Sequence, residues 1–199
     1  MKKLLFLSAV FIFGFTACSV RNIPTQPSSK AEQGVVINGV RWATRNVETP
    51  GTFANSPESF GRLYQWNRLQ SWGTVGEIMG WDSSVPPNEW DAHNDPCPQG
   101  WRVPTQAELN SLGNSSTTSI TQNGTIGRLY GIAPNQIFLP AAGWRNNSGA
   151  LNSIGVDGYY WSSTPIGGAN AQALWFSSEY SDVGHNFTAY GFSVRCVAK

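Results

Sequence analysis

Scattered glycine and proline residues limit the fold of this chain more than any other sequence feature. The sequence has 21 Gly and 12 Pro among its 199 residues, with many Asn and Ser between them. Gly and Pro destabilise helix interiors, and Asn and Ser favour turns, so a helical bundle or a coiled coil is excluded. Nine Trp and only 13% charged residues exclude a disordered chain. These features predict one compact, loop-rich domain with an aromatic core and a short appendage.

The N-terminal segment is typical of an export signal. Lys2 and Lys3 precede an apolar run, Leu4 to Phe15, as in signal peptides, and this run is too short for a transmembrane helix. It ends in F-T-A-C, which resembles the lipobox of Bacteroidetes-type bacterial lipoproteins. We therefore expect residues 1–17 to be a lipoprotein signal peptide and Cys18 to carry lipid. The alternative is an ordinary secretory signal that is cut near Ala17.

A lipid on Cys18 would make the membrane a partner of this protein, because several acyl chains on one residue anchor stably. The expected location is the cell envelope, as an outer-membrane lipoprotein. The residues after Cys18 lack the acidic run that resembles a surface-export signal, so the periplasmic and the surface face both stay open. Residues 18–33 are poor in apolar side chains and predict a flexible tether. The folded domain is expected over residues 34–199.

The three cysteines support this division. An odd number in an exported protein suggests that one Cys has a separate use. If Cys18 carries the lipid, Cys97 and Cys196 remain as a pair that an oxidising compartment would let bridge. A metal site with two Cys ligands is the competing interpretation, but zinc sites usually have four ligands at close spacing. We expect one disulfide.

Local patterns predict short helices followed by antiparallel strands. Asn38-Gly39 predicts a hairpin turn between two strands. Ser56-Pro57 is a possible helix start, and Thr105 with Glu108 forms a capping box for a second helix that ends near Gly113. Further strands are expected at Gln136–Pro140, Gly158–Ser162, Ala173–Phe176 and Gly191–Val197. This order predicts an α+β fold.

Five segments of the domain resemble a known family. They are G-V-R-W-A-T-R-N-V (39–47), G-R-L-Y-Q-W (61–66), C-P-Q-G-W-R-V-P-T-Q-A-E-L (97–109), G-Y-Y-W-S-S-T (158–164) and G-F-S-V-R-C-V (191–197). Together they resemble the Fibrobacter succinogenes major paralogous domain, over about residues 35–198. The resemblance implies a C-type-lectin-like fold, related to formylglycine-generating enzymes. It also implies a disulfide between the helical region and the last strand. It implies less about activity, because one fold can host many functions.

No pattern in the sequence indicates catalysis. The two histidines, His93 and His185, lie outside any hydrolase or metalloprotease motif, and there is no phosphate-binding loop. The reactive cysteine pair of the formylglycine-generating relatives has no counterpart, because the pair present here is the structural one. Without Lys2 and Lys3 the chain has 11 basic and 12 acidic residues, so nothing indicates a nucleic-acid partner. We expect no enzyme activity.

Acidic residues gather in one part of the chain. Asp82, Glu89, Asp91 and Asp95 fall within 14 residues, and oxygen-rich loops can hold Ca²⁺. Their spacing matches no EF-hand loop, and turn and cap roles explain Asp equally well. We expect no metal or other cofactor, and we keep these four residues only as weak calcium candidates.

The tryptophans divide into two groups. Trp42, Trp66, Trp101 and Trp161 lie in the family-like segments and are expected in the core. The other five lie nearer polar loops, where an exposed ring beside amides could stack on a sugar. The alternative for the loop group is a half-buried turn residue. The ligand-binding candidates are Trp144, Arg145, Asn146, Asn147 and Asp157.

The basic residues of the expected domain are almost all arginine. Between Ala31 and Ala198 the chain has eight Arg and no Lys, and the planar guanidinium suits fixed hydrogen-bonded positions. We expect Arg102 and Arg195 to pair internally. The resulting hypothesis is a lipid-anchored, non-catalytic binding protein of the bacterial envelope, adhesin-like or glycan-binding, with an unidentified glycan or protein ligand. The alternative is a structural or assembly subunit of a fimbrial or envelope complex.

Overall fold

The computed structural model describes residues 32–199, which form one compact unit from Glu32 to Lys199. The Glu32 carboxylate holds the start of this unit, because it accepts hydrogen bonds from Gly34, Thr44 and Arg45. The expected signal peptide (1–17), the lipid on Cys18 and most of the expected tether (18–33) lie outside the described residues. No helix of residues 32–199 is long and apolar enough to cross a membrane.

The fold is mostly β, with 41% of residues in strands and 7% in helices. The α+β, C-type-lectin-like prediction is therefore wrong, and no lectin fold is identified. One physical reason lies at Gly61, where we expected a helix that began at Ser56-Pro57. Gly61 has a φ of 67°, and a Cβ on it would lie 2.4 Å from the Val47 carbonyl oxygen. The segment instead approaches Val47 as non-helical chain, and Arg62 N–H donates to that carbonyl.

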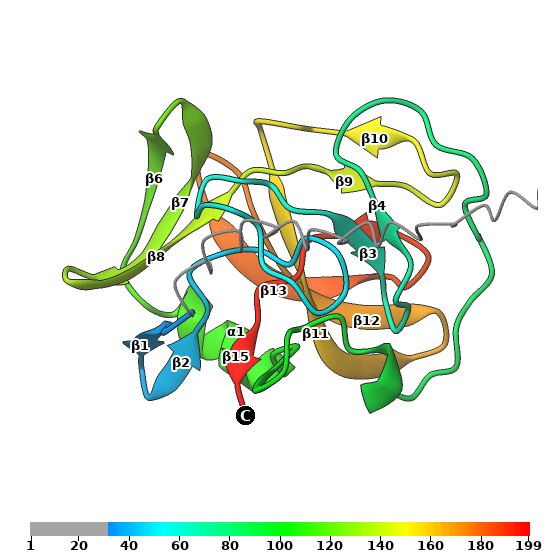
Figure 1. Ribbon diagram of the computed structural model, residues 1–199, viewed down its shortest axis with the longest axis horizontal. Helices are drawn as coiled ribbons and strands as arrows, with labels where there is room; N and C mark the ends of the chain where they lie inside the picture. The colour runs from blue at the N-terminus through cyan, green and yellow to red at the C-terminus, as the bar shows by residue number, and fades with distance from the viewer. Residues whose placement is uncertain (1–31) are drawn as a thin grey trace, which may run out of the picture. The chain divides into compact units, whose positions relative to one another are not determined.

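Four antiparallel sheets make up the domain (Figure 1). The first has the order β1-β2-β15-β5, and its strands are β1 Val35–Ile37, β2 Val40–Trp42, β15 Val197–Ala198 and β5 Trp101–Arg102. The second has the order β10-β9-β14-β3-β4, and its strands are β10 Leu151–Asn152, β9 Trp144–Arg145, β14 Gly191–Phe192, β3 Leu63–Gln65 and β4 Ser71–Trp72.

The other two sheets have three strands each. The third sheet is β11 Gly158–Gly167, β12 Asn170–Phe176 and β13 Ser181–Phe187. The fourth is β6 Thr117–Gln122, β7 Thr125–Ile132 and β8 Asn135–Pro140. Within these two sheets, β8, β11 and β12 overlap expected strands, whereas no strand was expected at β6, β7 or β13. The turn between β6 and β7 is Asn123-Gly124, the same hairpin signal as at Asn38-Gly39, so this hairpin was readable from sequence.

Two local predictions are confirmed. Asn38 and Gly39 have φ values of 49° and 82° and close the hairpin between β1 and β2. The helix α1, Gln106–Gly113, begins with a capping box in which Thr105 accepts from Glu108 N–H and the Glu108 carboxylate accepts from Thr105 N–H. Leu109 and Leu112 bury the inner face of α1 in the core beside the third sheet. A short 3₁₀ helix, η1 Ala92–Asn94, lies in the preceding long connection.

The disulfide prediction is confirmed. Cys97 and Cys196 are joined, with their Cα atoms 6.0 Å apart and 99 positions apart in the chain. The bridge fixes the segment after η1 to the chain between β14 and β15. Both sulfurs are thereby used, so the two-Cys metal site is excluded.

The core is rich in aromatic rings and buried arginines. Trp42, Trp66 and Trp161 are fully buried as expected, whereas Trp101 is half-buried. Arg195 is also buried and donates to Asn46 Oδ1 and to the carbonyls of Ala43 and Phe138. Burial lowers its pKa to about 10. Arg102 pairs with Glu108 at 2.6 Å. These contacts confirm the internal pairing expected for Arg102 and Arg195.

Candidate functional site

Strand β9 separates two of the sequence candidates. Successive residues of a strand point to opposite faces, so Trp144 and Arg145 face different environments. Trp144 is half-buried and packs on Tyr159, Tyr190 and Phe192. Arg145 is 1% exposed and reaches the loop after β4. One face of β9 therefore leads to a group of aromatic rings and the other to a loop anchor.

The aromatic rings on the Trp144 side form a continuous chain of contacts that we call the aromatic row. Neighbouring ring centroids are 5.0 to 6.5 Å apart. The row consists, in order, of Tyr180, Trp175, Tyr159, Trp144, Tyr190 and Phe187. Tyr180 and Phe187, at its ends, are 55% and 52% exposed, and the four between them are half-buried. Such edge and offset contacts stabilise aromatic groups beyond the area they bury.

Strand alternation assembles this row from distant parts of the chain. Tyr159 of β11 is paired directly with Trp175 of β12, and Trp175 is paired with Asp182 of β13. Phe192 of β14 is fully buried and supports the row from the core, because its ring contacts Trp144, Tyr159 and Tyr190.

Two carboxylates accompany the row. Asp182 is exposed and lies across the strand pair from Trp175. Burial raises the pKa of Tyr159, and the charge of nearby Asp157 raises it further. The Tyr159 hydroxyl therefore stays protonated and can donate a hydrogen bond at neutral pH. The row thus combines apolar ring surface with hydroxyl donors and carboxylate acceptors.

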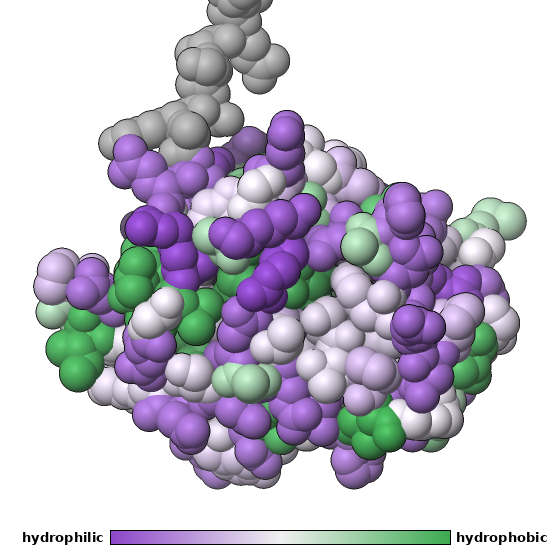
Figure 2. Space-filling view, turned by 90° about the horizontal axis from the view of Figure 1, so that it is seen from below, coloured by the Kyte–Doolittle hydropathy of each residue, from purple (hydrophilic) through white to green (hydrophobic). Residues whose placement is uncertain are grey.

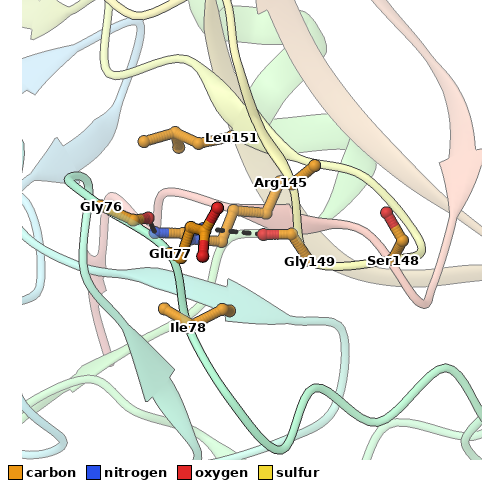
Figure 3. Close-up of a pocket in the computed structure, with 8 residues that line it drawn as sticks. Gly76, Glu77, Ile78, Arg145, Ser148, Gly149 and Leu151 are labelled. Atoms are coloured by element: carbon orange, nitrogen blue, oxygen red, sulfur yellow. Dashed lines mark hydrogen bonds between the residues drawn. The ribbon is translucent and has the colours of Figure 1, made fainter.

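Arg145 belongs to a different feature, a pocket of about 520 Å³ (Figure 3). Its guanidinium donates to the carbonyls of Gly73, Val75, Gly76 and Gly149. Burial lowers the pKa of Arg145, yet the surrounding carbonyls hold the charge in place. We predicted that Arg145 could face a ligand; instead, its contacts fasten the loop after β4 onto the turn after β9.

The remaining sequence candidates lie on that turn and near the row. Asn146 Oδ1 accepts from Ser148 N–H and Ala150 N–H, at 2.9 and 3.0 Å, and so shapes the turn. Asn147 is exposed at the turn, whereas Asp157 is half-buried beside Tyr159. Of the five ligand candidates, the structure brings Trp144 and Asp157 to the aromatic row.

The four calcium candidates do not form a cluster. Hydrogen bonds from Ser84 and then from Arg68 lower the pKa of the Asp82 carboxyl to about 2. Asp91 caps η1, and Asp95 accepts from the N–H groups of Cys97 and Val103. Glu89 is exposed, and its backbone carbonyl accepts from Asn67. Within residues 32–199, no group of three or more acidic, His or Cys side chains is placed to hold a metal.

Neither histidine is enclosed by other groups. His93 Nδ1 lies 2.9 Å from Asp91 Oδ1, but its side chain is 96% exposed. His185 is exposed on β13.

The sequence analysis groups Trp175 with the loop tryptophans and does not single out Tyr159, Tyr180, Phe187 or Tyr190. Tyr159 and Trp161 are two positions apart in an expected strand and so share one face, which was the local signal for part of this group.

Comparisons with known proteins identify the family of the chain but not its activity or ligand. A search of curated proteins and a search of solved structures each found no match. A scan against protein-family models matched the Fibrobacter succinogenes major domain over residues 21–198. The match spans the segments on which the resemblance was noted and covers most of the chain. The chain therefore belongs to the Fibrobacter succinogenes major domain family.

Proposed function

We propose that this protein is a non-catalytic binding protein of the bacterial envelope, anchored through lipid on Cys18, and that it binds a glycan at the aromatic row. The single observation that carries the glycan proposal is the row itself. Six aromatic rings in continuous contact, two of them more than half exposed, lie beside two carboxylates.

The chemistry of the row suits a sugar. The apolar faces of a sugar ring pack on aromatic side chains, and a few placed polar groups fix its orientation. Trp175 and Tyr180 would supply the ring surface, while Asp182 and the Tyr159 hydroxyl would bond to sugar hydroxyls. The rings are held by neighbours and by Phe192, so little side-chain freedom is lost on binding.

The proposal is tested with the full chain on an array of host and microbial polysaccharides, followed by titration with Trp fluorescence as the readout. We expect Trp175→Ala to weaken glycan binding at least tenfold and Tyr180→Ala to weaken it measurably. Trp90→Ala is the matched control, because Trp90 is half-buried and contacts Trp66 rather than the row. Absence of glycan binding, or equal binding by wild type and Trp175→Ala, would refute the proposal.

A second function has one specific observation in its favour. Val75 and Met79, in the loop that Arg145 fastens, are 78% and 93% exposed. Exposed apolar side chains on an ordered loop suit contact with another protein, as in a structural or assembly subunit of a fimbrial or envelope complex. Crosslinking and co-purification distinguish this function: loss of a partner in Met79→Ser, with glycan binding intact, would favour it.

A further inference from the structure

The outer edge of β6 has free backbone groups. Gln122 and Thr125 flank a two-residue turn and form a directly opposed pair, so they exchange backbone hydrogen bonds. The bond from Gly131 N–H to Ser116 C=O, at 2.8 Å, follows the same alternation. The backbone groups of Thr117, Ser119 and Thr121 therefore point away from β7. In the described part of the chain, no hydrogen bond reaches these outward groups.

The opposite edge of the same sheet is closed. On β8, the outward carbonyl of Phe138 accepts from Arg195 Nη2 at 3.0 Å, and that of Pro140 accepts from the Tyr160 hydroxyl at 2.7 Å. Core side chains thus occupy the hydrogen-bonding positions that a further strand would need. The fourth sheet can extend on the β6 side and not on the β8 side.

β6 also lacks the features that protect edge strands. Charged residues, proline and short length prevent edge-to-edge pairing in natural sheets. One edge strand of the third sheet, β13, carries exposed Asp182 and His185. β6, in contrast, is the six-residue segment T-T-S-I-T-Q, without a charged residue, proline or glycine. Threonine and isoleucine favour strands.

The edge is held rigid near both ends. Glu58 Oε1 accepts from Gln122 Nε2 and Asn123 Nδ2, at 2.7 and 2.8 Å. At the other end, Arg128 Nε donates to Thr117 Oγ1 at 2.8 Å. In Figure 1, β6 lies at the outer margin of the domain. A partner strand would meet a preformed edge, which reduces the ordering cost of association.

We propose that β6 is a self-association surface on which β6 of a second copy pairs in antiparallel direction. A twofold axis at Ser119 would place Ser119 opposite its own copy and Thr117 opposite Thr121. Every outward backbone group would then be paired, with about six hydrogen bonds across the axis. Cross-strand Thr and Ser pairs are favourable, and the uncharged strand meets its copy without like-charge repulsion. This self-complementarity selects a second copy as the occupant.

The test measures the oligomeric state of the full chain in detergent by analytical ultracentrifugation. We expect a dimer that Ser119→Pro weakens at least tenfold, because proline removes an outward N–H without breaking a β6–β7 bond. Ser119→Ala keeps that N–H and should dimerise like the wild type. Equal thermal unfolding temperatures would show that the proline variant is folded.

Cysteine crosslinking tests the register and does not depend on the proline variant. Directly opposite residues in a hydrogen-bonded pair have Cα atoms about 5.5 Å apart, which permits a disulfide. Ser119→Cys should therefore crosslink into dimers under mild oxidation, whereas Thr118→Cys, opposite Ile120 of the copy, should not. A monomer at all concentrations would overturn the proposal, even if it captured another protein. So would a dimer that Ser119→Pro leaves unchanged, or equal crosslinking at both positions.

Discussion

Replacement of Arg145 by methionine tests whether this residue is a structural anchor. Met keeps the length and the apolar stem but removes all donors to the carbonyls of Gly73, Val75, Gly76 and Gly149. A hydrogen bond from a charged donor contributes about 1.5–3 kcal/mol. Four such carbonyls give about 6 kcal/mol even at the lower value, before any opposing terms.

The desolvation of Arg145, which lowers its pKa, opposes this gain, and water can reach the released loop. We therefore expect Arg145→Met to lower the free energy of unfolding by about 3 kcal/mol, which corresponds to about 6–12 °C in the unfolding temperature. The assay is urea unfolding of the full chain, followed by Trp fluorescence. Limited proteolysis should show new cleavage near Val75 and Met79.

Arg41→Met is the matched control for this experiment. Arg41 is exposed and donates one hydrogen bond, to the Gln33 carbonyl, so its loss should cost less than about 0.5 kcal/mol. If Arg145→Met unfolds within about 1 kcal/mol of the wild type and its loop resists protease, the anchor role is refuted. Loss of ligand binding with unchanged stability would instead indicate that Arg145 contacts the ligand.

Three further predictions concern the stability of the fold. The double variant Cys97→Ala with Cys196→Ala should have a free energy of unfolding up to about 4.7 kcal/mol below that of the wild type, because the bridge closes a loop of about 100 residues. Urea unfolding of the variant, and of the wild type with and without a reducing agent, measures this difference, and equal stabilities of the bridged and unbridged proteins would contradict it. Thr105→Ala should cost about 1 kcal/mol by removing the cap of α1, and Thr105→Ser should restore most of it; equal unfolding of the two variants would be inconsistent with the capping role. Burial would raise the pKa of Glu108, but hydrogen bonds from Arg102 and Thr105 outweigh this effect and lower the pKa. The ionised Glu108 carboxylate therefore stabilises the folded state fully above the unfolded pKa near 4.3, and this stabilisation is lost as pH falls through the lower folded value. Thermal unfolding from pH 7 to pH 2 should therefore show a smaller acid-dependent decrease in Glu108→Gln, and an unchanged decrease would argue against this role.

Local sequence signals predicted the parts of the fold that depend on near neighbours. Asn38-Gly39 set the first hairpin because both residues accept positive φ. Thr105 and Glu108 are three positions apart, so a capping box follows from the helix itself. The same kind of signal at Asn123-Gly124 marked the hairpin that contains β6. β13 gave no signal, because the polar His185 lies between Val183 and Phe187 at the position that an apolar alternation would need.

The predictions of a helix from Ser56-Pro57 and of a lectin-like fold failed where long-range contacts decide. The approach of Gly61 to Val47 depends on residues 14 positions apart, and no local pattern encodes it. The sheets join strands from both ends of the domain, as when β15 pairs with β2 and β5. Such pairings follow from the register and packing of the whole chain.

The candidate site shows the same division. The sequence by itself determined the family-like segments, the supply of aromatic rings and the cysteine pair that remains if Cys18 is used elsewhere. Only the tertiary structure decided which ring meets which, because Tyr180, Trp175, Tyr159 and Trp144 become neighbours through the pairing of β11 with β12 and their packing on β9 and β14. It also decided that Trp144 joins the row while Arg145 anchors a loop. Adjacent residues of a strand point to opposite faces, and the surroundings of each face are set by distant parts of the chain.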